Sequence, residues 1–105
     1  MQVAVRFSGD LVETRRWVSA VLGDLASMTD SDDRLRETLS VFLQLGSSFK
    51  ATADVMHLHV NSVKYRVQRA VERRGRDVAD DRLDVEVALM LAHWFGDAIL
   101  VPSDE

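Results

Sequence analysis

The chain has 105 residues, a formal net charge of −4 and no cysteine. This length allows one domain with a modest core. A composition of 47% hydrophobic and 29% charged residues argues against disorder, and no apolar stretch is long enough to span a membrane. The absence of cysteine excludes disulfides, thiolate nucleophiles and zinc knuckles. The first residues lack the layout of a signal peptide, so we expect a cytoplasmic protein.

Positive charge is concentrated in one segment. Six basic residues and one acid, Glu72, lie between His59 and Arg76, so this segment carries +5 while the other residues together carry −9. A phosphate backbone responds to local charge, because salt screens charges that lie more than about 10 Å away. Charge runs are also common on solvated helix faces, so the charge pattern alone leaves both interpretations open.

The first helix is predicted at about 11–26. Asp10 and Glu13 have the spacing of a capping box, and apolar residues then recur at helical intervals. Gly23 is a point where this helix can bend. The preceding residues, 1–10, are expected to form a tail.

A second helix is predicted at about 32–45. Leu35, Leu39 and Phe42 lie at positions i, i+4 and i+7, which places them on one side of a helix. Gly46 is suited to the position that follows a helix C-terminus.

A short helix ending near Met56 and a longer helix over about 60–74 follow, joined by a tight connection. Ala53 is small enough to let these two helices approach closely near the turn. Together with the helix at 32–45, they predict a helix-turn-helix at about 48–74 within a three-helix core over about 32–74.

The last helix is predicted from about residue 80 to Phe95, and it is apolar nearly all round. Such a helix is either buried between layers or part of an interface. The fold class is therefore all-α: one helical domain over 11–97, with tails at 1–10 and 98–105.

The helix at 60–74 has two chemically different sides. At about 100° per residue, its apolar side comprises Val60, Val63, Val67, Ala70 and Val71. The opposite side carries Asn61, Tyr65, Gln68 and Arg69, with Lys64, Arg66 and Arg73 at its flanks. Amide, phenol and guanidinium groups of this kind contact base edges and phosphates in DNA.

Several of these side chains have two possible roles. Asn61 and Gln68 would contact bases, or they are surface amides. Lys64 would contact phosphate or base, and Tyr65 either does the same or packs its ring on the protein. His59 either contacts phosphate or caps the helix.

The remaining candidates also leave alternatives open. Arg66, Arg69 and Arg73 are predicted phosphate ligands, although one or two of them could form ion pairs within the helix, for instance with Glu72. Val60 either meets a thymine methyl group or fills the core, and its angular position favours the core. The candidate DNA-binding residues are thus His59, Val60, Asn61, Lys64, Tyr65, Arg66, Gln68, Arg69 and Arg73.

Catalytic and cofactor motifs are absent from the sequence. The three histidines do not have metal-ligand spacing, no nucleophile-elbow pattern occurs, and the glycines are scattered rather than gathered in a phosphate-binding loop. We therefore predict no catalytic, cofactor-binding or metal site and no enzyme activity.

The motif at 59–67, His-Val-Asn-Ser-Val-Lys-Tyr-Arg-Val, resembles the C-terminal helix-turn-helix of PucR-type bacterial regulators, a family that includes purine-catabolism and sugar-diacid regulators. The resemblance extends over about 20–96. It implies a DNA-binding output domain of a transcription factor, with the helix at 60–74 in the major groove. Regulators of this family usually carry sensor and middle domains ahead of this unit, so the chain looks like a C-terminal portion.

Three positions depart from the family pattern. His57 stands where the family usually has glycine, and it must therefore tolerate the conformation of the turn. Lys50 takes the place of a frequent hydroxyl cap. Val60 replaces a frequent arginine and removes a charged donor from the start of the recognition helix.

The predicted partner is double-stranded DNA, with no membrane and no small-molecule ligand in this fragment. We also predict a homodimer that binds half-sites about one helical turn, ~10 bp, or a multiple of that apart. The alternative is a helical protein-interaction or dimerisation module with a degenerate helix-turn-helix that does not bind DNA. The net charge of −4 and Val60 favour this alternative.

Overall fold

The computed structural model describes residues 11–102, and over that range the chain is all-α, as predicted. Its helices are α2 (Leu11–Leu22), α3 (Asp30–Gln44), α4 (Phe49–Met56), α5 (Val60–Arg74) and α6 (Arg82–Phe95). Short 3₁₀ turns follow at η1 (Gly23–Ala26), η2 (Val78–Asp80) and η3 (Gly96–Ala98). No helix within the described range is long and apolar enough to cross a membrane. The predicted tail at 1–10 lies outside the described residues.

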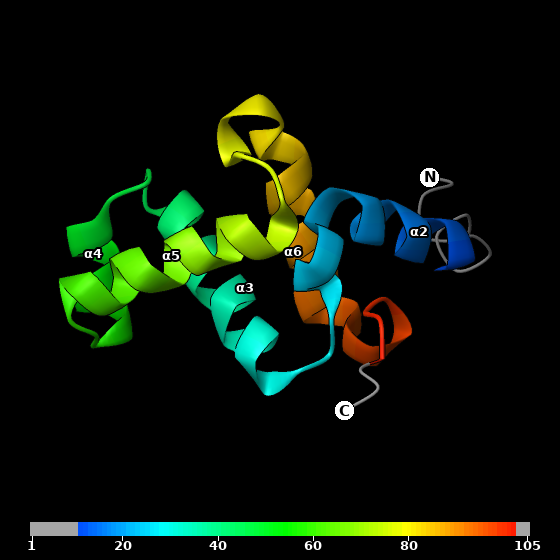
Figure 1. Ribbon diagram of the computed structural model, residues 1–105, viewed down its shortest axis with the longest axis horizontal. Helices are drawn as coiled ribbons and strands as arrows, with labels where there is room; N and C mark the ends of the chain where they lie inside the picture. Colours follow the sequence, from blue (N-terminus) through cyan, green and yellow to red (C-terminus); the bar gives the residue numbers. More distant parts are fainter. Residues whose placement is uncertain (1–10, 103–105) are drawn as a thin grey trace.

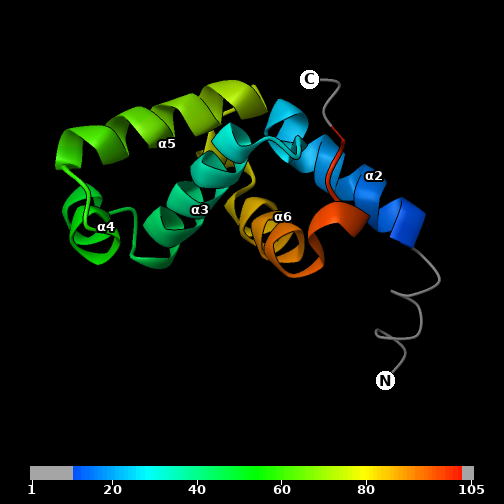
Figure 2. The same ribbon diagram turned by 90° about the horizontal axis from the view of Figure 1, so that it is seen from below.

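Helix α3 lies at the centre of the arrangement (Figures 1 and 2). It packs against α5 and α4 on one side and against α6 on the other, and α2 packs mainly along α6. Helix α5 therefore runs along one side of the molecule and α6 along the opposite side, as Figure 2 shows most clearly. The predicted three-helix core is present as α3, α4 and α5.

Side-chain caps explain where α3 and α4 begin. The Thr29 hydroxyl accepts a hydrogen bond from the Asp32 N–H at 3.1 Å, so α3 starts at Asp30, two residues before the predicted position. The Ser48 hydroxyl accepts from the Ala51 N–H at 3.0 Å in the same way. Each cap provides a partner for one of the N–H groups that a helix start leaves unpaired.

Residues 98–101 differ from the predicted tail at 98–105, of which residues 103–105 lie outside the described range. Ile99 and Leu100 are buried in the core. The Val101 N–H donates to the carbonyl of Ala26, and the Val101 carbonyl accepts from the Met28 N–H, both at 2.9 Å. Residues 98–101 are thus part of the domain, because two apolar side chains and two backbone hydrogen bonds attach them to the segment that connects α2 to α3.

The helix predicted at 11–26 ends at Leu22, and the 3₁₀ turn η1 begins at Gly23, where a bend was expected. Gly23 has φ +59°, and a Cβ atom at this position would lie 2.6 Å from the Arg74 carbonyl oxygen at the end of α5. The buried Arg74 side chain donates from Nε to the Val21 carbonyl at 2.6 Å and forms an ion pair with Asp81. The end of α2 is therefore attached directly to the end of α5.

Candidate nucleic-acid interface

The turn between α4 and α5 depends on a histidine in the left-handed conformation. His57 has φ 57° and ψ 43°, and the Leu58 N–H donates to the Ala53 carbonyl at 3.0 Å. This pattern is that of a Schellman motif, in which a left-handed residue ends the helix. Glycine adopts that conformation without a steric penalty, whereas histidine accepts it at a modest cost. His57 thus adopts the conformation of the turn, as its position in place of glycine requires.

His59 caps the start of α5. Its Nδ1 accepts a hydrogen bond from the Asn61 N–H at 3.0 Å. Because Nδ1 accepts, the neutral ring carries its hydrogen on Nε2, which leaves a donor on an exposed side chain. Of the two roles considered for His59, the structure provides the cap and leaves the ring accessible.

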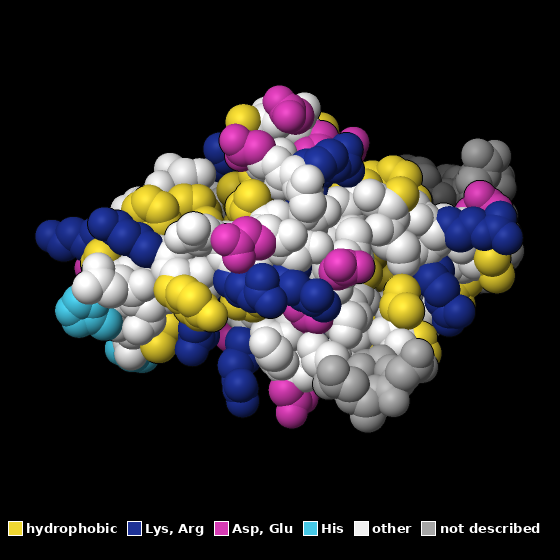
Figure 3. Space-filling model, in the orientation of Figure 1, with side chains coloured by type: hydrophobic (Ala, Val, Ile, Leu, Met, Phe, Trp, Pro, Cys, Tyr) yellow, Lys and Arg dark blue, Asp and Glu magenta, His cyan; other side chains and the backbone are white. Residues whose placement is uncertain are grey.

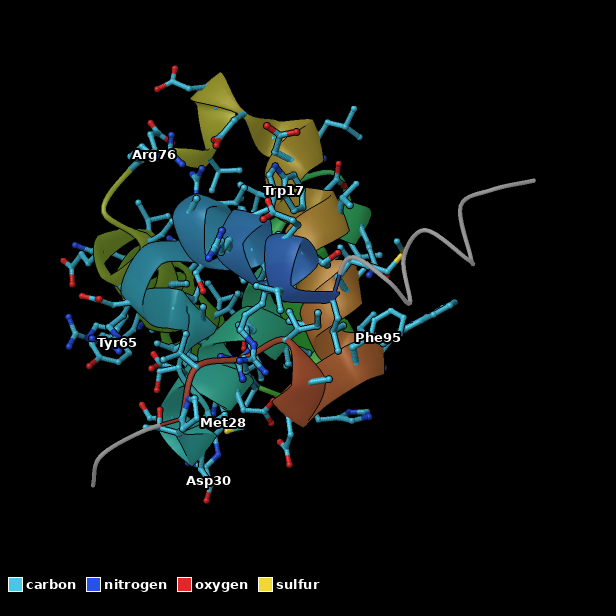
Figure 4. All side chains as sticks on the ribbon, turned by 90° about the vertical axis from the view of Figure 1, so that its right-hand side faces the viewer. Trp17, Met28, Asp30, Tyr65, Arg76 and Phe95 are labelled. Carbon is cyan, nitrogen blue, oxygen red and sulfur yellow. The ribbon has the colours of Figure 1, made fainter. Side chains whose placement is uncertain are left out.

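The outer side of α5 is exposed, as its sequence pattern predicts. Asn61, Lys64, Gln68 and Arg69 are exposed, and Tyr65 is 67% exposed. Beneath them, the apolar side of the helix is buried or half-buried. Figure 4 shows Tyr65 at the edge of the molecule, away from α6, and Figure 3 shows Lys and Arg side chains interspersed with acidic ones on this face.

Val60 and Lys64 both contact the protein at the N-terminal half of α5. Val60 is half-buried and packs against the core, which supports the core interpretation. The Lys64 ammonium lies 5.7 Å from the centre of the Phe49 ring, and that ring packs on Phe42 with 4.8 Å between centroids. This cation–π contact restrains an exposed lysine without neutralising its charge.

The arginines of α5 differ in their environments. Arg66 is half-buried, and Arg69 is exposed and lies 3.3 Å from Glu72 one turn away. An exposed pair of this kind contributes little and can be replaced by a stronger ligand such as phosphate. Arg69 therefore forms the ion pair within the helix that the sequence allowed, and it still remains accessible.

Arg73 and Arg74 are held by the protein itself. Arg73 donates to both carboxylate oxygens of Asp32, at 2.9 and 2.7 Å, and to the Asp24 carbonyl at 3.0 Å. Arg74 is buried, and Arg76 lies 3.4 Å from Asp81. Much of the +5 charge of the segment from His59 to Arg76 is therefore engaged in internal ion pairs. Arg73, a predicted phosphate ligand, lies instead at the contact between α3 and α5.

Asp32 is ionised in this contact. Its burial would by itself raise the pKa, but the hydrogen bonds from Arg73 and Thr29 and the positive charge of Arg73 outweigh that effect, so the pKa of Asp32 lies below its ordinary value. Nearby, the buried Arg36 donates to the Leu25 and Ser27 carbonyls, each at 2.6 Å, and burial lowers its pKa. These contacts hold the N-terminus of α3 against η1 and α5.

Lys50 is an exposed basic residue outside the predicted DNA-binding positions. It is the second residue of α4, next to Phe49, whose ring lies under the Lys64 ammonium. Its exposed ammonium adds to the positive charge where α4 and α5 meet. The signal in the sequence was a lysine at the start of a short helix ahead of the turn. Among the described residues, no group of His, Asp or Glu side chains could hold a metal ion.

A sequence profile of the PucR C-terminal helix-turn-helix domain matches residues 35–91. The match includes most of α3 and α6 and all of α4 and α5. Among known proteins, the chain is 28% identical over 79 residues to the purine catabolism regulatory protein of Bacillus subtilis, covering 75% of this chain and 15% of that protein.

Two further relatives match shorter stretches. The transcriptional activator PmfR of Paenarthrobacter nicotinovorans is 39% identical over 62 residues, which cover 59% of this chain and 13% of PmfR. The uncharacterised protein YxkF of Bacillus subtilis is 40% identical over 48 residues, or 46% of this chain and 16% of that protein. The chain thus spans only a small part of these relatives, and no solved structure matches it. The profile match covers more than half of the chain and includes the motif at 59–67. This chain therefore belongs to the PucR C-terminal helix-turn-helix family, whose members are domains of transcription regulators and not enzymes.

Proposed function

We propose that this DNA-binding regulatory domain binds double-stranded DNA with α5 in the major groove. The observation that carries the proposal is the exposed polar side of α5 above a buried apolar side. A major groove about 12 Å wide admits one α-helix with its side chains. Over residues 11–102, the side chains of Asn61, Tyr65 and Gln68 form no hydrogen bond that would have to break before they reach base edges.

The exposed side of α5 supplies the base contacts in this proposal. Asn61 and Gln68 present amides that can pair with adenine, and Tyr65 presents a hydroxyl between them along the helix. Lys64, held above Phe49, contacts phosphate or base. These groups form the sequence-discriminating part of the surface, and the exposed donor of the His59 ring contacts phosphate beside them.

Phosphate contacts come from Arg66, Arg69 and, at the start of α4, Lys50. Arg69 exchanges its exposed ion pair with Glu72 for a charge-assisted hydrogen bond to a phosphate oxygen. Arg73 is left out of the proposed contact set, because Asp32 holds its guanidinium. Val60 contributes packing rather than a base contact. A regulatory protein that acts on bacterial DNA would work in the cytoplasm.

The experiment that tests this proposal is a titration of a labelled random duplex pool at two salt concentrations, followed by selection and sequencing of bound duplexes. We expect binding that weakens steeply with salt and a recurrent sequence among the selected duplexes. The alternative function, a protein-interaction module without DNA binding, is favoured by the net charge of −4 and by exposed apolar residues on α6. Binding no stronger than background at low salt would select that alternative.

A further inference from the structure

The outward side of α6 carries an apolar stripe that the rest of the described chain leaves exposed, except at Val87, which is half-buried. Leu83, Val87, Met90 and Trp94 lie at i, i+4, i+7 and i+11, which places them on one side of the helix. Leu83 and Trp94 are each 73% exposed, and Met90 is 47% exposed. This spacing is the pattern by which one helix packs along another. We refer to these four residues as the α6 stripe.

The side of α6 that faces α3 is hollowed next to this stripe. Two adjacent grooves of about 370 and 280 Å³ lie between the two helices and share Ser40, Gln44 and His93 as lining residues. Met90 and Trp94 line the smaller one. An apolar ridge beside a groove with a polar rim can receive the side chains of a partner helix.

We propose that a second copy of this chain covers the α6 stripe, with its own α6 running antiparallel. A two-fold axis that passes between residues 88 and 89 brings Leu83 against the partner's Trp94 and Val87 against the partner's Met90. Such an interface is isologous, because each copy contributes the same surface. It covers the most exposed apolar side chains of α6 in both copies at once.

The contacts at the edge of the stripe, one polar and favourable and one between like charges, select the antiparallel direction. Glu86 and His93 lie on the same side of the stripe, since both line the smaller groove. The antiparallel two-fold places Glu86 within one helical turn of the partner's His93, twice in the dimer, where the imidazole N–H can donate to the carboxylate. A parallel alignment would instead bring Glu86 near the partner's Asp84, which is a contact between like charges. Arg82 lies 3.9 Å from Glu86 and extends the polar rim.

The position of α6 decides what such a dimer does with DNA. Helix α6 lies across α3 from α5 (Figure 2), and Tyr65 and Phe95 lie on opposite sides of the molecule in Figure 4. Pairing through α6 therefore places the two α5 helices on opposite outer faces. They cannot enter successive major grooves of one straight duplex, as the half-site arrangement expected from the sequence would require. The dimer instead joins two duplex segments. This consequence rests on the proposed function, whereas the pairing through α6 does not rest on it.

Sedimentation velocity of the whole chain over a concentration series tests the pairing without DNA. We expect a monomer–dimer equilibrium that Met90→Glu weakens by at least roughly tenfold, because the substitution would bury a carboxylate in an apolar contact. The matched control is Val55→Glu, at a position on α4 that is 58% exposed and far from α6, and it leaves the equilibrium unchanged. Circular dichroism establishes that both variants are folded. A wild-type chain that stays monomeric throughout overturns the proposal and points to another segment of a longer protein as the occupant.

Cross-linking tests the register, and it does not depend on a destabilising change. The chain has no cysteine, so Val87→Cys and Met90→Cys each introduce a single thiol. Under mild oxidation, a mixture of the two proteins is expected to give more disulfide-linked dimer than either protein alone. Equal yields in all three samples contradict the antiparallel register.

A bridging assay tests the consequence for DNA. One duplex is fixed to beads and a second, labelled duplex is added with the protein. Wild-type chain is expected to retain the labelled duplex, whereas Met90→Glu binds each duplex but loses the retention. Retention by Met90→Glu, or dimers that bind one duplex only, overturns the bridging inference. If neither protein binds any DNA, the proposed function fails, while the sedimentation result still decides the pairing.

Discussion

Arg73, in the last turn of α5, donates from Nε and Nη2 to the two carboxylate oxygens of Asp32, in the first turn of α3. The two residues are 41 positions apart in sequence. Such a two-point contact fixes both distance and orientation between the helices. It holds α5 at a defined angle on the core.

The first prediction separates this role from DNA contact. Arg73→Ala is expected to lower the free energy of unfolding by about 2 kcal/mol, because it leaves the buried carboxylate of Asp32 without its cationic partner. Arg66→Ala should change stability little but weaken binding to every duplex. Denaturant unfolding and the salt dependence of DNA affinity measure the two effects. If folded Arg73→Ala has a shallower salt slope than the wild type, Arg73 binds phosphate after all.

The second prediction concerns pH. The folded-state pKa of Asp32 lies below its ordinary value of 3.8, so its ionised form stabilises the fold above that pH. This contribution is lost as pH falls from about 3.8 through the lower folded-state pKa. Asp32→Asn should therefore be less stable than the wild type at neutral pH, and the difference should shrink only in that acidic range. Unfolding curves at several pH values check this, and a difference that stays constant down to pH 2 would count against it.

The third prediction compares two glycines with similar backbone angles. Gly23 has φ +59° and Gly46 has φ +70°, but only at Gly23 would a Cβ atom overlap another backbone atom, the Arg74 carbonyl oxygen. Gly46→Ala should cost about 1 kcal/mol for its conformation alone. Gly23→Ala should cost about 3 kcal/mol, because α2 and α5 must also move apart. Thermal or denaturant unfolding of the two variants measures the loss of stability. Equal losses in both variants would show that the close approach of Gly23 to the Arg74 carbonyl does not stabilise the fold.

The fourth prediction distinguishes capping from charge at His59. His59→Ala should destabilise the chain by about 1 kcal/mol through loss of the cap on Asn61 N–H. His59→Asn and His59→Asp should both restore the cap and most of the stability. Only His59→Asp should weaken DNA binding strongly, since it adds a negative charge at the proposed interface. Similar DNA affinities for the Asn and Asp variants would place position 59 away from the phosphates.

The fifth prediction concerns the two kinds of contact on α5. Asn61→Ala is expected to relax the preference for particular bases, by about 1–3 kcal/mol of discrimination. Arg69→Ala should weaken all sequences alike and reduce the slope of log affinity against log salt by about 0.9. Selection from random duplexes followed by titrations at several salt concentrations measures both changes. Uniform loss in both variants would refute this division of labour.

The sequence by itself determined the helical class, the helix-turn-helix and the two sides of α5. These follow from local interactions: the 3.6-residue period decides which side of a helix can be buried, and small or capping residues such as Ala53 and Ser48 mark the turns. The local motif also located the helix with the exposed polar side, since Asn61, Tyr65 and Gln68 are exposed as its period requires.

Only the tertiary structure decided which arginines remain available to a ligand. Arg69 and Arg73 look alike in sequence, yet Arg73 meets an aspartate from the start of α3, while Arg69 meets only its own helix. In the same way, Ile99 and Leu100 become core residues because the chain returns to η1, and the α6 stripe faces away from α5 because α3 lies between them. Each outcome depends on contacts between residues far apart in sequence, and helical periodicity, which is a property of neighbours along the chain, carries no information about them.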